Sequence, residues 1–136
     1  MTVKYYVRKL IRLFPEFQRS YQMHRKYYHR KFLPHVFFGD ALNPILSELL
    51  KTNQDTEQIE KYIAFLEDMY QNGDTDVRNI VEVTILEYLG DDETVLRHAF
   101  GYFSEDLMQA SKAVEASWGR RDIRIFYRGG KVFADW

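Results

Sequence analysis

The sequence of 136 residues contains no cysteine, and this absence excludes several kinds of chemistry. Disulfide bonds, zinc sites with cysteine ligands and catalysis by a thiol all need a residue that the chain lacks. A chain without disulfides also fits a reducing compartment. We therefore expect the protein in the cytoplasm.

Long hydrophobic runs are also lacking. No apolar stretch approaches the roughly 20 residues that a membrane-spanning helix needs. The first residues, MTVKYYVRKLIRLFPEF, carry cations throughout, at Lys4, Arg8, Lys9 and Arg12. A secretory signal has an uninterrupted apolar block, which these cations break up. We therefore predict neither a membrane segment nor a signal peptide.

Recognised catalytic motifs are a third absence. The chain has no glycine-rich phosphate loop, no His-Glu-x-x-His and no nucleophile elbow. Gly129 and Gly130 lie between two β-prone runs, so this pair indicates a hairpin turn and not a phosphate site. We predict a protein that is not an enzyme and that holds no cofactor and no metal.

Acidic residues are scarce at the start of the chain and abundant in its middle. Residues 1–35 hold nine Lys or Arg and only Glu16, for a net charge of +8. Residues 36–118 carry −12 and residues 119–136 carry +3. Two interpretations stay open: the segments pair with one another on folding, or they form surface patches of opposite sign that steer charged partners.

Helical periodicity is what the chain does contain. Apolar residues at helical spacing predict helices over 4–13 and 16–32, the second carrying a stripe from Phe17 to Phe32. Gly39 predicts a break, after which Asp40 caps a short turn and Pro44 lies in the first turn of a helix that ends near Lys51. Later helices are predicted to begin after caps at Asp55 or Thr56, at Asp74 or Thr75, near Asp92, and at Ser104.

The end of the chain changes character. The runs 123–127 and 131–136 are β-prone and predict a hairpin, which must lie on the helices or on a partner because a lone hairpin is marginally stable. We therefore predict a mainly α fold over residues 1–136. It is a single-domain bundle of six or seven helices, orthogonal or solenoid-like, with helices over 4–118 and a hairpin over 122–136.

The acids at helix ends have two interpretations. As caps and first-turn charges they stabilise helix starts, which accounts for each one singly. A charge of −12 is more than capping needs, so a broad negative surface is the second interpretation. The stretch around 71–76 and the stretch around 90–94 flank one helix, at its two ends, so they do not form one compact cation site. Inside that helix, Glu82 and Glu87 are expected on a solvated strip or paired with an arginine.

The basic start also has two interpretations. MHRKYYHRK interleaves cations with aromatics, a pattern that suits phosphate contacts and base stacking. The other interpretation is a solvated helix face whose long side chains lie over the core. A nucleic-acid-binding module is therefore the alternative function, and its expected contacts are Arg25, Lys26, Tyr27, Arg30 and Lys31.

Three stretches carry a resemblance to a known family. They are LFPEF, then FFGDALNPILSELL, then IEKYIAFLEDMYQNGDTDVRNIVEVTILEYLGDD. The third holds an FLE-M helix (Phe65, Leu66, Glu67, Met69), a GD–V-N turn (Gly73, Asp74, Val77, Asn79) and an E-TILE-L-DD helix (Glu82, Thr84, Ile85, Leu86, Glu87, Leu89, Asp91, Asp92). This order resembles small bacterial immunity proteins of toxin systems, including contact-dependent growth inhibition, over roughly residues 10–120.

The resemblance implies a protein that neutralises a cognate toxin by forming a 1:1 complex. Many such toxins are nucleases with basic active sites, so a nuclease is the expected partner. An acidic helical surface then occupies the place of the phosphates and speeds association. The expected contacts are Glu60, Glu67, Asp68, Asp74, Asp76, Asp91 and Asp92.

Overall fold

The computed structural model describes residues 1–136 as seven helices followed by a two-stranded antiparallel hairpin. The prediction of a mainly α single domain with a C-terminal hairpin is confirmed. Three of the labelled segments, α5, η1 and α6, join into one continuous helix. The elements are α1 (Val3–Leu13), α2 (Phe17–Tyr27), α3 (Pro34–Thr52), α4 (Thr56–Asn72), α5 (Thr75–Ile80), η1 (Val81–Leu86), α6 (Glu87–Leu89), α7 (Glu93–Phe100), α8 (Glu105–Ser117), β1 (Arg124–Arg128) and β2 (Lys131–Asp135).

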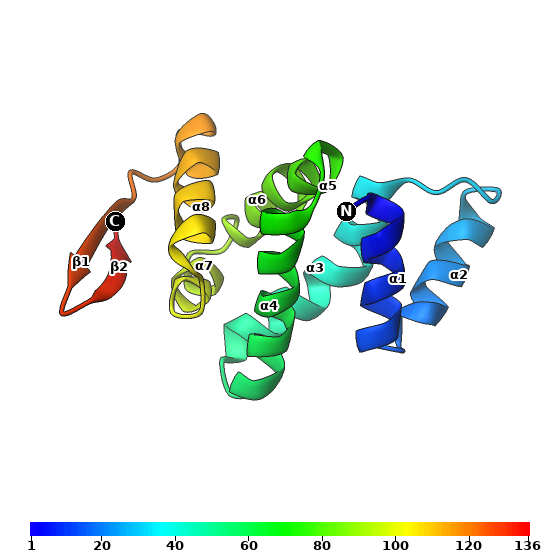
Figure 1. Cartoon of the computed structure of the whole chain (residues 1–136), viewed down its shortest axis with the longest axis horizontal. Helices are drawn as coiled ribbons and strands as arrows, with labels where there is room; N and C mark the ends of the chain where they lie inside the picture. The colour runs from blue at the N-terminus through cyan, green and yellow to red at the C-terminus, as the bar shows by residue number, and fades with distance from the viewer.

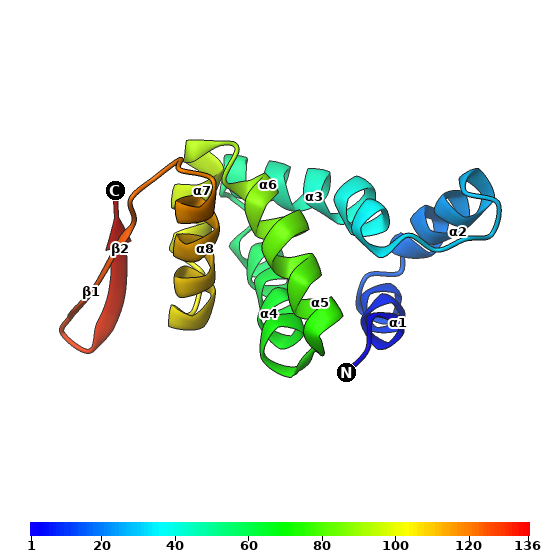
Figure 2. The ribbon, with the colours of Figure 1, turned by 90° about the horizontal axis from the view of Figure 1, so that it is seen from above.

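The helices follow one another along the long axis of the molecule. Figure 1 shows α2, α1, α4, α8 and the hairpin in that order from one end to the other. Figure 2, seen from above, shows α3 running along the same axis. Because α3 contacts α2, α4, α7 and the helix that contains η1, it ties the two ends of the array together.

One hydrophobic core of 32 buried residues runs through the helices. Its aromatic part joins the first two helices to α4: the rings of Phe14 and Tyr62 stack with centroids 4.1 Å apart, and Phe17 meets Tyr62 edge-on at 6.3 Å. A buried Phe contributes about 1.5–3 kcal/mol relative to an exposed one. Aromatic side chains therefore anchor the basic start of the chain to α4.

Helix starts agree with the capping signals in the sequence. The side chains of Asp55, Asp74 and Ser104 accept backbone N–H groups of the first turns of α4, α5 and α8. Asp92 does the same for α7, accepting from Thr94 and Val95. Each cap contributes about 1 kcal/mol.

The predicted break at Gly39 is wrong. α3 is continuous from Pro34, which occupies its first turn, so Pro44 lies inside the helix and not at its start. The buried face of α3, including Phe37, Phe38, Leu42, Leu46 and Leu50, lies on both sides of these two residues. Burial of that face outweighs the local cost of a glycine and a proline.

The predicted extension of the second helix to Phe32 is also wrong, because α2 ends at Tyr27. His29 and Arg30 adopt left-handed backbone angles, with φ of 54° and 69°, and they reverse the chain. The buried His24 holds the turn, since its Nε2 accepts the Leu33 N–H at 3.1 Å. Burial lowers the pKa of His24, which favours the neutral ring that this acceptor role requires. Phe32 still packs on Tyr21, with 5.7 Å between the ring centroids. The contact of Phe32 with the apolar stripe was therefore predicted correctly, although the helix does not extend to it.

A π-helical segment, η1, interrupts the central helix. It packs against α3, α4 and α8. Asn43 of α3 donates to the Thr84 carbonyl at 3.1 Å, and His35 lies 2.6 Å from the Thr84 hydroxyl. The two glutamates of this helix are half-buried, and Glu82 accepts the Tyr70 hydroxyl at 3.3 Å.

The hairpin packs one face on the helices. Its register pairs Ile125 with Ala134 and Tyr127 with Val132. Ile125, Val132, Ala134 and Trp136 pack against the core, and the Trp136 ring meets Phe100 at 5.4 Å. The hairpin is thus supported by the helices of its own chain.

Candidate binding surfaces

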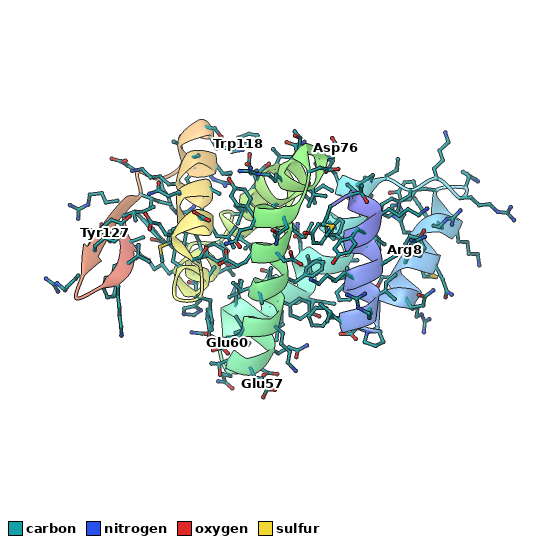
Figure 3. The ribbon with its side chains drawn as sticks, viewed as in Figure 1. Arg8, Glu57, Glu60, Asp76, Trp118 and Tyr127 are labelled. Carbon is teal, nitrogen blue, oxygen red and sulfur yellow. The ribbon has the colours of Figure 1, made fainter.

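The seven predicted acidic contacts do not come together on one surface. Asp74 and Asp76 lie at the start of α5, whereas Asp91 and Asp92 follow the end of α6. Figure 3 shows Asp76 far from Glu60, which lies near the opposite end of α4. Only Glu60, Glu67 and Asp68 share one helix and one hollow.

Three of the four predicted acids at the ends of the central helix are engaged in holding the fold. Asp74 and Asp92 are helix caps, and Asp92 also pairs with Lys51 at 3.1 Å. Asp91 pairs with Arg120 at 2.8 Å. Asp74 and Asp92 therefore agree with the capping interpretation, for the starts of α5 and α7, whereas Asp91 is held by an ion pair.

The acidic hollow on α4 has a volume of about 600 Å³ and is lined by Glu60, Glu67 and Asp68, with Lys9 of α1 and Tyr102 at its sides. Asp68 is committed within the chain: it pairs with Lys9, and it accepts from the Tyr6 hydroxyl at 3.1 Å and the Asn72 amide at 2.8 Å. Burial alone would raise its pKa, but hydrogen bonds from Lys9, Asn72 and Tyr6 outweigh burial and hold the pKa below its ordinary value. Asp68 therefore joins α1 to α4.

Glu60 and Glu67 are the carboxylates of this hollow that form no ion pair within the chain. Glu60 is exposed and makes no ion pair. Glu67 is half-buried and accepts the Ser104 hydroxyl at 2.7 Å. Burial raises the pKa of Glu67, although hydrogen bonds from Ser104 act in the opposite direction. A raised pKa beside a hollow marks a carboxylate that an incoming cation would stabilise.

A buried ion cluster, which the sequence did not predict, fixes the C-terminal segment. The carboxylate of Glu115 is 1% exposed and pairs with both Arg120 and Arg121. Arg120 also donates to the Glu87 carbonyl at 3.1 Å, and Arg121 donates to the Gly90 carbonyl at 2.6 Å. Two of the five cations of the basic tail, Arg120 and Arg121, therefore close the fold around the end of α6.

A basic groove of about 900 Å³ lies between α1, α2 and the turn after α2. Its cations are Lys4, Arg8, Arg12, Arg25 and Arg30, and its floor is apolar. No acidic side chain lines it, and none of its five cations forms an ion pair. Figure 3 shows Arg8 on the side of α1 that faces α2.

The structure divides the residues predicted to contact nucleic acid. Arg25 and Arg30 line the basic groove. Tyr27 and Lys31 line a separate hollow of about 640 Å³, and Lys26 is exposed outside both. The three cations of α1 were not among the predicted contacts, although their spacing of four residues places them on one helix face.

Most of the chain matches one protein family. The profile described as a domain of unknown function, DUF7674, matches residues 7–119. The chain belongs to the DUF7674 family. Neither the curated proteins nor the solved structures compared with the chain contain a match.

The DUF7674 match includes some of these surfaces and leaves others out. It covers the acidic hollow of α4 and most of the basic groove, and it ends before Arg120, Arg121 and the hairpin. No helix of this DUF7674 protein is both long enough and apolar enough to cross a membrane. Its His, Asp and Glu side chains form no group of three or more arranged to hold a metal ion.

Proposed function

We propose that the chain is an immunity-type inhibitor that binds a bacterial toxin one to one and acts by occupying it. The acidic hollow of α4 is the proposed contact, and a nuclease-type toxin with a basic active site is the proposed partner. The observation that carries the proposal is the pair Glu60 and Glu67, two carboxylates beside one hollow that form no ion pair within the chain, since Lys9, the cation that also lines the hollow, pairs with Asp68.

An arginine or lysine from the partner would find two different carboxylates in this hollow. Glu60 is exposed and belongs to the outer part of the contact, where charge mainly speeds association. Glu67 is half-buried, so pairing it with a cation would offset a desolvation cost that the free protein already bears. The sequence resemblance to immunity proteins, which includes Glu67, supports the same proposal.

The contacts of the acids also decide which substitutions can test binding without disturbing the fold. Reversing Asp74, Asp91 or Asp92 would remove caps or an ion pair, so a loss of protection would not separate binding from folding. Glu60→Lys and Glu67→Gln avoid this problem. Glu48→Lys is the control for Glu60→Lys, with the same change in net charge, because Glu48 is exposed on α3 and forms no ion pair.

The experiment tests protection from a toxin domain encoded beside this chain. Cells that express the toxin should survive with the wild-type chain and with Glu48→Lys, whereas Glu60→Lys combined with Glu67→Gln should weaken protection and binding. A removed rim charge should slow association, and a removed desolvated pair should cost about 2–5 kcal/mol and speed dissociation. A double variant that protects as well as the wild type would rule out the acidic hollow, and the absence of any bound toxin would rule out the immunity function.

A further inference from the structure

The basic groove lies on the other side of α1 from the acidic hollow, and α1 presents two parallel rows to it. One row is Lys4, Arg8 and Arg12, and the next is Val3, Val7 and Ile11. Residues four apart in a helix rise about 6 Å along its axis and lie on nearly the same face. α1 therefore offers an exposed cationic ridge beside an aliphatic ridge of the same repeat, in which Val3 and Ile11 are half-buried and Val7 is only 6% exposed.

The opposite wall is held in place by contacts within the chain. Arg25 donates to the Arg30 carbonyl at 3.3 Å, and its guanidinium lies 5.9 Å from the centre of the Tyr21 ring. The Arg30 N–H in turn donates to the Arg25 carbonyl at 2.7 Å. The turn that carries Arg30 is thus fixed before any ligand arrives, which reduces the ordering cost of binding.

The charge of the groove requires an anionic ligand. Lys9, on the same helix, pairs with Asp68, but the five cations of the groove have no carboxylate partner. Four of the five are arginines, whose planar forks bind carboxylates and phosphates through two hydrogen bonds.

The floor distinguishes between a protein and a nucleic acid. Val3, Val7 and Ile11 are aliphatic and offer no ring on which a base can stack. The aromatic floor residues, Tyr21 and Phe32, are half-buried and pack on each other and on Phe37 at 5.4–6.0 Å. A partner with apolar side chains beside its anions fits this floor better than a phosphate backbone with bases.

We propose that the basic groove receives an acidic amphipathic helix of a partner protein. Its apolar row lies mainly against Val3 and Ile11, the half-buried members of the aliphatic ridge, and its carboxylates, spaced four residues apart, pair with Lys4, Arg8 and Arg12. Helices pack by inserting ridges of four-residue spacing into grooves of the same spacing, and amphipathic helices bind apolar grooves in this way. The site is separate from the acidic hollow of α4, so the proposal stands or falls independently of the toxin contact.

The test uses a synthetic helical peptide of about 18 residues in which leucine and glutamate each recur every fourth residue. Binding to the full chain is measured by fluorescence anisotropy at several salt concentrations. A scrambled peptide of the same composition and a single-stranded oligonucleotide of matched charge are measured alongside. The groove variant is Arg8→Glu with Arg12→Glu, and its control, with the same change in net charge, is Lys26→Glu with Lys31→Glu.

We expect the patterned peptide to bind more tightly than the scrambled one and the oligonucleotide. The groove variant should weaken binding about tenfold or more, and the control variant much less, because long-range charge alone is screened by salt. Circular dichroism and thermal unfolding confirm that both variants are folded. The Glu60→Lys variant should bind the peptide as the wild type does.

Three results would overturn the proposal. Equal binding of the scrambled peptide would show a charged surface without helix recognition. Tighter binding of the oligonucleotide, lost in the groove variant, would assign the groove to nucleic acid. Self-association of the chain in sedimentation, abolished by the same variant, would assign it to a second copy, whose α4 carries exposed acids of its own.

Discussion

The first 35 residues and the last 18 both carry excess positive charge, yet the fold uses the two sets of cations in different ways. Of the nine Lys and Arg of the start, only Lys9 forms an ion pair. In the tail, three of the five Lys and Arg are paired, namely Arg120, Arg121 and Arg124, the first two with the buried Glu115. Pairing on folding therefore describes the tail, and an unpaired surface describes the start. A cation that is already paired within the folded chain attracts an anionic partner less strongly than an unpaired one. The start is therefore the better candidate for binding an anionic partner.

The largest test of this comparison breaks the buried cluster of the tail. Glu115→Ala leaves two largely buried guanidinium groups without a counter-charge and should cost about 3–5 kcal/mol in the free energy of unfolding. Asp135→Ala is the matched control, since it removes a carboxylate from an exposed Arg124 pair and should cost about 0–1 kcal/mol. Urea unfolding of both variants measures the difference. Similar costs would mean that the tail charges do not hold the fold.

A second test examines the glycine beside this cluster. A Cβ added to Gly90 would lie 2.6 Å from a Glu115 oxygen and 2.5 Å from an Arg120 nitrogen, so Gly90→Ala should destabilise by about 1–3 kcal/mol. Gly39→Ala should do the opposite. A Cβ added to Gly39 would lie 3.6 Å from the Thr84 side chain, which is an ordinary contact distance. Gly39 is inside α3, and alanine inside a helix is favoured over glycine by about 0.5–1 kcal/mol. Opposite shifts in thermal unfolding are the expected result, and a loss of stability in both variants would contradict it.

The one ion pair of the start gives an intermediate effect with a defined pH dependence. The folded protein lowers the pKa of Asp68, so its charge contributes stability above the ordinary value of 3.8, and that contribution is lost as pH falls through the folded pKa. Asp68→Asn should therefore cost about 1–3 kcal/mol at pH 7. The cost should begin to shrink below pH 3.8 and shrink further as pH falls toward the lowered pKa of the folded protein. Thermal unfolding across this range is the measurement. A cost that does not change with pH would point to packing and not to charge.

Glu67 should show the opposite sign. Its pKa in the folded protein is raised above 4.5, so its ionisation costs the folded state stability as pH rises past that value. Glu67→Gln should therefore unfold at a slightly higher temperature than the wild type at pH 7, and the difference should disappear below pH 4.5. A carboxylate kept at a cost to stability agrees with its proposed role in the acidic hollow. A variant less stable than the wild type at pH 7 would assign Glu67 to the fold instead.

Local signals in the sequence predicted the parts of the structure that depend on neighbouring residues. The caps at Asp55, Asp74 and Ser104 and the Gly129–Gly130 turn follow from side chains within a few positions. Continuity of α3 through Gly39 and Pro44 was missed because long-range burial, which the local pattern does not contain, outweighs two weak helix formers.

The candidate sites were harder to predict for the same reason. The pair of Asp91 with Arg120 and the contact of Tyr6 with Asp68 join positions far apart in the chain, so no spacing rule reveals them. The cationic row of α1 was visible in the sequence as a four-residue spacing. What the sequence did not show is that folding leaves this row unpaired, because that depends on which acids α2 and the following turn bring close.

The smallest expected effect tests that unpaired row directly. Replacing Lys4, Arg8 and Arg12 by glutamine removes three positive charges that no carboxylate of the chain balances. Surface changes of this kind normally alter stability by no more than about 0.5 kcal/mol each, and here the removal of like-charge repulsion favours the folded state. The variant should unfold at or slightly above the wild-type temperature at low salt, and the difference should vanish at high salt because screening already weakens the repulsion. Changing the paired Lys9 to glutamine is the matched control on the same helix, and it should lower stability. A marked loss of stability in the triple variant would mean that these cations of the start stabilise the fold, as the paired arginines of the tail do.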